Sequence, residues 1–457
     1  MQQTKGAMGR RQFIGTGLLV GAAASSAAAA SPSAGATQAS ASKKQRIALV
    51  GTGSRGTVTW GRGLIHPFKD YVEMVALCDI NPKRVKEAQK QIGTDAPTYL
   101  AADFDRMIRE TKPDTVIITT PDCFHADYAV RAMELGVDVV CEKPLATDEK
   151  QCQLLLDTEA RTGGKLITTF NARFGASSEE IKKILLSGEL GQIIAADFHE
   201  YLDTSHGADY FRRWHGKMRF SGSLLVHKAS HHFDQMNWWL DAEPEEVHAY
   251  GKVAFYGKNG SFRGKNCRSC AFTQKCDFYW DITKNERMKA LYVACEDEDG
   301  YLRDGCVFDQ SIDTYDTMTV QVTYNNGVLL TYTLHAFMPY EGQTIAFTGA
   351  KGRLDVRCFS QQPWPVEEDA RLRLTLNFKG TREWTLAKRQ GEHGGADDQL
   401  KELLFRPGHR DPLNRRAGSR AGVLSSLIGI AARQSIETGE TVRIKDLVTF
   451  PLQWGWA

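Results

Sequence analysis

The stretch RIALVGTGSRG, residues 46–56, decides how this chain folds. An apolar run at residues 47–50 leads directly into Gly51, Gly53 and Gly56, which have G-x-G-x-x-G spacing. The first glycine permits a tight turn, the second lets a pyrophosphate approach the backbone, and the third lets the next helix pack on the strand. That helix offers unpaired N–H groups and the positive end of its dipole to phosphates. The stretch therefore predicts a dinucleotide-binding loop.

A second apolar strand supports this interpretation against that of a structural glycine-rich turn. It covers residues 74–78 and ends in Asp79, which follows Gly56 by 23 positions. A carboxylate at this place can hydrogen-bond an adenosine ribose. Ser54 and Arg55, between the second and third glycines, are further predicted cofactor contacts.

The choice between NAD and NADP stays open at this point. Asp79 would repel the 2′-phosphate of NADP, which favours NAD. Lys83 and Arg84 lie close enough in sequence to accept that phosphate.

Strands and helices alternate from Arg46 to about Phe170, which is typical of a doubly wound parallel sheet. The strand at 115–119 and the next, at 137–141, each end in polar residues, where ligands of such sheets bind. The predicted cofactor contacts at these ends are Thr120, Pro121, His125, Glu142 and Lys143. The chain is therefore expected to form an α/β domain over residues 43–170.

Residues 171–457 have a different pattern. Strand-like runs at 193–201, 246–255, 317–324 and 327–335 follow one another, and the last two flank an Asn-Asn-Gly hairpin turn. Runs of strands without β-α alternation indicate an α+β domain.

The motifs together resemble the glucose–fructose oxidoreductase, inositol dehydrogenase and MocA (Gfo/Idh/MocA) family. They are the glycine fingerprint, a TTP with a histidine four residues on, E-K-P-L at 142–145 and N-A-R-F at 171–174. The resemblance implies a Rossmann domain followed by a large, mostly antiparallel open sheet that carries the substrate site. It also implies NAD(P)-dependent oxidation of a sugar, glycoside or polyol, and often a homo-oligomer.

Residues 222–240, GSLLVHKASHHFDQMNWWL, carry the second part of the predicted site. His227, His231 and Asp234 recur at i, i+4 and i+7, so they share one face if the stretch is helical. The resemblance gives His231 the role of general base and lets Lys143 orient the reacting hydroxyl. His227 stands where the family has an acid, so it is expected to share the proton, bind substrate or hold a metal with His231. A purely structural histidine is the alternative.

Further side chains are candidates for gripping a hydroxyl-rich substrate, with ordinary loop residues as the alternative. They are Asn171, Arg173, Tyr201, Arg213, Trp214, Lys228 and Asp234.

A cysteine-rich insertion is predicted at about residues 257–312. It holds Cys267, Cys270, Cys276, Cys295 and Cys306. The spacing fits a structural zinc site loosely, and disulfides fit an oxidising compartment. Either scheme leaves one cysteine over.

The first 42 residues are expected to be a twin-arginine export signal and linker, which do not belong to the folded domains. Arg10 and Arg11 precede an Ala/Gly-rich stretch with an A-x-A pattern before Ser31. No later apolar run is long enough to span a bilayer, so a periplasmic or extracellular protein is expected. The balance of 57 basic and 55 acidic residues gives no electrostatic case for nucleic-acid binding.

The leading hypothesis is an exported oxidoreductase that moves hydride between a carbohydrate hydroxyl carbon and a nicotinamide, with the NAD held tightly. Two rivals stay open. One is a glycosidase of related fold that uses NAD as a transient oxidant. The other is a non-catalytic sugar-binding relative, suggested by the lost acid at His227.

Overall fold

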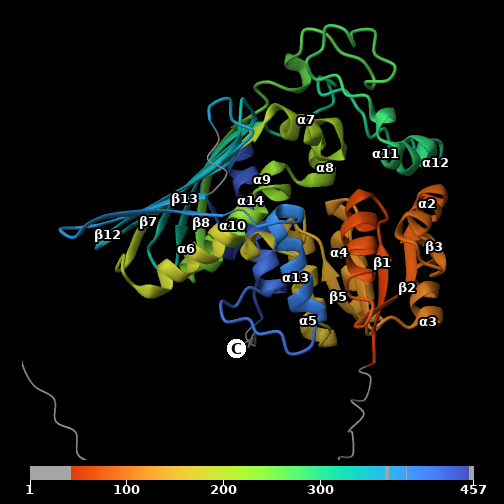
Figure 1. Cartoon of the computed structure of the whole chain (residues 1–457), viewed down its shortest axis with the longest axis horizontal. Helices are drawn as coiled ribbons and strands as arrows, with labels where there is room; N and C mark the ends of the chain where they lie inside the picture. Colours follow the sequence, from red (N-terminus) through yellow and green to blue (C-terminus); the bar gives the residue numbers. More distant parts are fainter. Residues whose placement is uncertain (1–42, 366–369, 388, 452–457) are drawn as a thin grey trace, which may run out of the picture. The chain divides into compact units, whose positions relative to one another are not determined.

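The computed structural model describes residues 43–365, 370–387 and 389–451. The predicted export signal and linker, residues 1–42, lie outside them. The described chain forms two sheets with helices around them (Figure 1).

The first sheet has the strand order β15-β6-β5-β4-β1-β2-β3. Its six parallel strands are β1 (Gln45–Val50), β2 (Val72–Asp79), β3 (Thr98–Leu100), β4 (Thr115–Ile118), β5 (Asp138–Cys141) and β6 (Leu166–Thr168). The short β15 (Ala417–Gly418) pairs antiparallel with β6. This is the doubly wound sheet that the alternation predicts, with one strand added from the C-terminal part.

Helices cover both faces of this sheet. They are α1 (Gly63–Ile65), α2 (Pro82–Ile92), α3 (Phe104–Thr111), α4 (His125–Glu134) and α5 (Glu149–Thr162). The helix after the glycine loop differs from the regular form expected, because η1 (Gly56–Arg62) is a π-helix.

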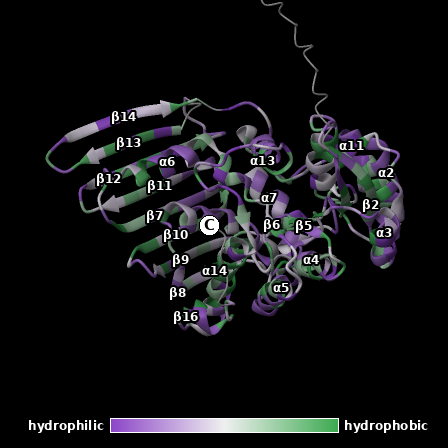
Figure 2. Cartoon of the chain, turned by 90° about the horizontal axis from the view of Figure 1, so that it is seen from below, coloured by the Kyte–Doolittle hydropathy of each residue, from purple (hydrophilic) through white to green (hydrophobic). Residues whose placement is uncertain are grey.

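The second sheet has the order β14-β13-β12-β11-β7-β10-β9-β8-β16 (Figure 2). Its strands are β7 (Ile193–Asp203), β8 (Pro244–Lys252), β9 (Thr317–Tyr324), β10 (Leu329–Met338), β11 (Glu341–Gly349), β12 (Gly352–Ser360), β13 (Ala370–Leu376), β14 (Gly380–Leu386) and β16 (Val442–Arg443). All neighbouring strands are antiparallel except β7 and β10. The predicted mostly antiparallel open sheet is therefore confirmed.

One face of this sheet is covered by helices. The helices of this part are α6 (Ala176–Ser187), α7 (Thr204–Arg212), α8 (Met218–Ser221), α9 (Leu224–His227), α10 (Ser230–Leu240) and α14 (Ser419–Thr438). Among them, α7 contacts β7 and β10, and α14 contacts β8. Along β7 the even-numbered residues from Ala196 to Leu202 are buried, and the odd-numbered residues between them are half-buried. Strand side chains alternate between faces, so β7 presents its even positions to the helices.

The helix predicted across the histidine segment is in fact two helices. α9 ends at His227 and α10 begins at Ser230, with Lys228 and Ala229 between them. His227 therefore lies on a different helix from His231 and Asp234.

The insertion has mostly short elements, among them α11 (Glu286–Leu291), η8 (Val293–Cys295) and α12 (Glu296–Asp299). Leu291 and Tyr292 belong to the same hydrophobic cluster as Ile47, Leu49 and Trp60 of the first domain. The segment thus bridges the two domains. α13 (Ala396–Phe405) packs on the first domain as well, and Leu400 and Leu403 share this cluster.

Within the described ranges, no helix has both the length and the apolar character that a membrane crossing requires.

Candidate active site

The glycine loop has the geometry that the fingerprint demands. Gly51 has φ +86°, and a Cβ there would lie 2.7 Å from the carbonyl carbon of Thr119. A Cβ on Gly56 would lie 2.1 Å from the carbonyl oxygen of Gly51. Both positions therefore need glycine, one for the turn and one for helix–strand packing.

A hydroxyl of the chain itself, that of Tyr292, contacts this loop. The backbone N–H of Ser54 donates to the Tyr292 hydroxyl over 2.7 Å, and a Cβ on Gly53 would lie 3.2 Å from that hydroxyl. Asp79 is held nearby, because its Oδ2 accepts from the N–H and the hydroxyl of Thr52 at 2.7 and 2.9 Å. The Ser54 amide thus takes an oxygen acceptor beside a fixed carboxylate, and a pyrophosphate at this amide would replace the Tyr292 hydroxyl.

A cavity of about 500 Å³ opens at the carboxyl ends of β4 and β5. Many of the predicted site residues line it together: Arg55, Thr120, His125, Glu142, Lys143, Asn171, Arg213, Trp214, His227, Lys228 and His231. The sequence motifs from both domains thus meet at one place, as ligand sites of such sheets do.

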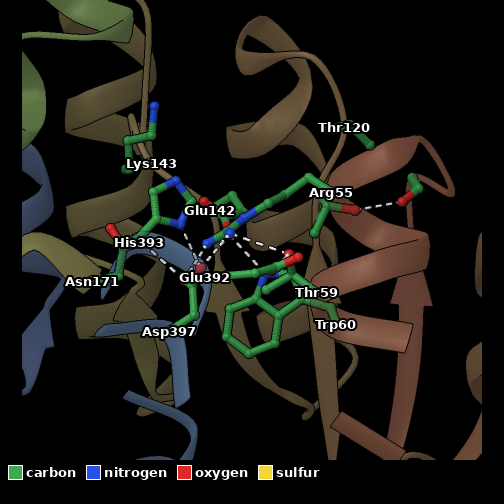
Figure 3. A network of polar contacts seen from close by, with 12 residues as sticks. Arg55, Thr59, Trp60, Thr120, Glu142, Lys143, Asn171, Glu392, His393 and Asp397 are labelled. Carbon is green, nitrogen blue, oxygen red and sulfur yellow. Dashed lines mark hydrogen bonds and ion pairs between the residues drawn. The ribbon is translucent and has the colours of Figure 1, made fainter. Parts of the chain in front are cut away.

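Arg55 ties the glycine loop to the rest of the site (Figure 3). Its Nε donates to Glu142 over 2.7 Å, and its two terminal nitrogens donate to Asp397 over 3.0 and 2.8 Å. Glu142 also accepts from the Trp60 indole over 2.7 Å. Burial works against the charge of Arg55, but Glu142 and Asp397 hold its pKa above the ordinary value. Arg55 and Glu142 therefore fix the loop and the E-K-P strand end together.

The C-terminal segment reaches the same cluster. Asp397 accepts from Asn171 over 2.9 Å and contacts Nδ1 of His393 at 2.6 Å (Figure 3). His393 has φ +49° and is followed by two glycines with positive φ, Gly394 and Gly395. This turn brings His393 to the cavity wall.

His227 has a carboxylate partner from the other domain. Its Nδ1 lies 2.6 Å from Oδ2 of Asp122, which follows the TTP strand end and is 2% exposed. Burial lowers the pKa of His227 well below its ordinary value, and Lys143 and Arg213 add to this. Burial raises the pKa of Asp122, while Lys143 favours its charged form. His227 is therefore an uncharged imidazole whose orientation Asp122 sets.

Lys143 and His231 complete the reactive group. The Lys143 ammonium donates to the backbone oxygen of His227 over 3.0 Å, and burial lowers its pKa to about 8. His231 is also kept uncharged, because burial and Lys143 lower its pKa well below the ordinary value. Its Nδ1 is buried without a hydrogen-bond partner among the described residues.

Lys228 forms an ion pair with a residue of the second sheet. Its ammonium lies 3.2 Å from Oε1 of Glu200, an inward residue of β7. Burial opposes the charge, but Glu200 keeps the pKa of Lys228 above the ordinary value. Glu200 also lies 3.5 Å from His232, which stacks on Phe198. His232 thus supports the cavity floor.

Aromatic and polar side chains form the wall next to His227. The rings of Tyr210 and His215 lie 5.3 and 4.2 Å from the His227 ring, and Trp214 stacks on His215. Arg213 pairs with Asp209 over 2.6 Å.

Three predicted substrate contacts lie elsewhere. Arg173 and Asp234 form a doubly hydrogen-bonded pair at 2.7 and 2.6 Å, and both are buried outside the cavity lining. Tyr201 is an outward residue of β7 and packs against Tyr340 and Phe359 on the other face of the sheet. The cavity thus holds only part of the predicted substrate set.

Two of the predicted cofactor contacts, His125 and Pro121, stabilise the loops at the strand ends. His125 is 1% exposed, and its ring nitrogens lie 2.7 and 2.9 Å from the carbonyl oxygens of Pro144 and Thr120. It therefore joins the two strand-end loops. Pro121 precedes η3 (Asp122–Phe124) and fixes the approach to Asp122.

The five cysteines of the insertion divide into four and one. Cys267, Cys270, Cys276 and Cys306 line a void of about 20 Å³, and Arg212 donates to Sγ of Cys267 over 3.1 Å. The Cys295 thiol faces the carbonyl oxygen of Ala290. All five thiols are unbridged, and no metal-binding group of three or more suitable side chains occurs in the described ranges. The described residues thus show neither the predicted zinc site nor a disulfide.

Comparison with known proteins now assigns the family. Residues 45–170 match the family model "Oxidoreductase family, NAD-binding Rossmann fold". Residues 182–444 match "Oxidoreductase family, C-terminal alpha/beta domain". The chain belongs to the Gfo/Idh/MocA oxidoreductase family. The resemblance drawn from the motifs is confirmed for both domains.

Two relatives and one solved structure give the range of similarity. YteT of Bacillus subtilis is 34% identical over 430 residues, covering 88% of this chain and 98% of YteT. Inositol 2-dehydrogenase of Salmonella typhimurium is 29% identical over 180 residues, 39% of this chain and 50% of that enzyme. The WlbA dehydrogenase from Bordetella pertussis, solved with NADH and UDP-GlcNAcA, has a TM-score of 0.61 at 20% identity, covering 88% of this chain and 99% of WlbA. The last comparison shows the shared fold.

Several side chains of the site were not predicted from the sequence. Asp122 directly follows the TTP motif, so its place at a strand end was a usable signal. Glu200 and His215 carried no such signal, because a strand and a short turn place them. Asp397 lies 226 positions from Asn171, and only the fold shows that it joins Arg55 to Asn171.

Proposed function

We propose that this chain is an NAD-dependent dehydrogenase that oxidises a hydroxyl-bearing carbon of a sugar, glycoside or polyol. The observation that carries the proposal is the meeting of Lys143, His227 and His231 in one cavity at the ends of the Rossmann strands. The nicotinamide, when bound, accepts the hydride that leaves the substrate carbon. The side chains supply orientation and proton transfer, which contribute much of the rate of such reactions.

We assign the general base to His227 rather than to His231, to which the resemblance gives that role, because of these two only His227 has a carboxylate partner among the described residues. Lys143 and Arg213 favour the charged form of Asp122 against its burial, and in that form the carboxylate accepts the Nδ1–H of His227, which leaves the Nε2 lone pair as the proton acceptor. The lowered pKa keeps His227 uncharged at neutral pH, as a base must be. The acid that the family has at this sequence position is thus replaced by a carboxylate from the Rossmann domain, and this argues against a non-catalytic sugar-binding relative.

His231 is proposed to donate a hydrogen bond to the substrate. A neutral imidazole has one N–H, and placing it on the buried, unpartnered Nδ1 would leave a donor unsatisfied. The proton is therefore favoured on Nε2. Lys143 donates to the backbone oxygen of His227 and acts electrostatically on both imidazoles, so its charged ammonium can stabilise the negative charge that develops on the reacting oxygen.

The cavity wall supports a hydroxyl-rich substrate. Tyr210 and Trp214 offer flat faces for the C–H groups of a sugar, and Arg213, Lys228 and Gln343 offer hydrogen-bond donors. The similarity to inositol 2-dehydrogenase, an enzyme named for a polyol, points the same way.

We also propose, from the sequence, that the protein is exported and forms a homo-oligomer. The paired Arg10 and Arg11 and the A-x-A pattern support twin-arginine export to the periplasm or beyond, with the NAD loaded before export and retained. A homo-oligomer also remains a prediction, which light scattering of the purified chain tests.

The test uses the purified full chain with NAD bound and a panel of free sugars, polyols and nitrophenyl glycosides. We expect absorbance at 340 nm to rise within one turnover for one substrate class. Nitrophenol release without net NADH would instead establish the glycosidase. Sugar binding with neither product would overturn catalysis altogether.

A further inference from the structure

The insertion closes over the adenosine end of the predicted dinucleotide site. In Figure 1 its helices α11 and α12 lie beside α2, which follows Asp79. Tyr292 contacts the glycine loop through Ser54, and the Asn81 side chain donates to the backbone oxygen of Cys295 over 2.8 Å. A segment more than 200 residues away in sequence therefore forms part of the surroundings of Asp79.

The first two cations after Asp79 in the sequence are both paired with acids of α12. Lys83 pairs with Asp297 and lies 3.2 Å from Glu298. The guanidinium of Arg84 lies 2.7 Å from Asp299 and 3.4 Å from Asp79. These are the cations that could otherwise receive a 2′-phosphate.

The charges at this place add up to an acidic environment. The carboxylates are Asp79, Asp297, Glu298 and Asp299, and they face Lys83 and Arg84. NADP differs from NAD by a phosphate on the ribose that a carboxylate such as Asp79 contacts. Bringing this extra negative charge to a site with surplus carboxylates costs free energy, and specificity follows from such a difference between two ligands.

We propose that α12 of the insertion selects NAD over NADP. Asp297, Glu298 and Asp299 occupy Lys83 and Arg84 and repel a 2′-phosphate, so that cofactor choice depends on the insertion as well as on Asp79. This inference rests on the NAD site of the proposed function.

The experiment compares NAD and NADP affinity in the full chain by calorimetric titration after bound nucleotide is removed. The test variant carries Asp297→Asn, Glu298→Gln and Asp299→Asn together. We expect its NADP affinity to rise about ten-fold or more relative to NAD. Glu286→Gln on α11 is the control, because Glu286 is exposed and pairs with Lys289 within the insertion. Its affinity ratio is expected to equal that of the wild type.

A second measurement needs no variant and remains informative if the triple variant fails to fold. Salt screens repulsion, so raising ionic strength in the wild type is expected to improve NADP binding relative to NAD. A wild type that prefers NAD, with a ratio that neither salt nor the triple variant changes, overturns the inference and leaves the proposed function standing. A wild type that binds neither nucleotide overturns both.

Discussion

The two ends of the predicted dinucleotide site are built in different ways. At the reactive end, Lys143, His227 and His231 line an open cavity of about 500 Å³. At the adenosine end, Asp79 is 7% exposed and its neighbours are paired with the insertion. Catalysis needs side chains that are oriented yet still available to a substrate, whereas the proposed selectivity needs cations that are already paired and carboxylates in excess. One site thus divides catalysis and cofactor selectivity between its two ends.

The largest expected effect comes from the reactive end. Lys143→Ala removes the charge that acts on both imidazoles, so turnover is expected to fall about 1000-fold while NAD binding persists. Single-turnover absorbance and NAD titration measure the two quantities. Lys150→Ala, an exposed lysine at the start of α5, is the matched control. Comparable turnover in Lys143→Ala would remove Lys143 from the mechanism.

The next effect separates structure from chemistry. Asp234→Ala leaves the buried Arg173 charge without its partner, so unfolding free energy is expected to drop by about 3–5 kcal/mol. Urea denaturation measures this, with the exposed Asp157→Ala as control. Unchanged stability together with lost substrate affinity would restore Asp234 to the substrate site.

Asp122 is expected to act through His227. Asp122→Asn keeps the shape but loses the charge that orients Nδ1, so kcat is expected to fall about 100-fold with little change in KM. The kcat and KM split distinguishes this from a loose fold, and the exposed Asp127→Asn is the control. If Asp122→Asn matched the control in kcat, the Asp122–His227 pair would have no part in proton transfer.

The pH profile is a smaller test of the same end. Burial lowers the pKa of Lys143 to about 8, so its ammonium is present below that pH and is lost above it. His227 and His231, with pKa values well below ordinary, stay neutral throughout this range. We expect kcat/KM to be flat near pH 7 and to fall about ten-fold per unit above pH 8. A rise across pH 8 would mean that neutral Lys143 is the active form.

The smallest effect is expected at Tyr201. It faces away from the cavity, so Tyr201→Phe is expected to change kcat/KM less than about two-fold. Tyr210→Phe at the cavity wall is the comparison variant. A larger loss in Tyr201→Phe than in Tyr210→Phe would show that the outward face of β7 takes part in substrate binding.

Some features that these tests probe could be predicted from the sequence, and others could not. The glycine loop and Asp79 were predictable, because turn geometry and strand ends are local properties. The parity of β7 was not, since a one-residue shift turns Tyr201 from one face to the other. The break at Lys228 depends on packing, and helical periodicity alone does not reveal it.

Long-range pairs were equally hidden. Asp122 and His227 are 105 positions apart, and Ser54 and Tyr292 are 238 apart. Arg173 and Asp234 were both predicted as substrate contacts, and only the three-dimensional contact shows that they bind each other. Such pairings are set by the tertiary fold, so a single sequence carries no direct sign of them.

The most direct test of this account is a crystal structure of the chain with NAD. We expect the nicotinamide ring in the cavity beside Lys143 and His227, and the adenosine ribose at Asp79 beneath the insertion. A nicotinamide ring bound away from Lys143 and His227 would contradict it.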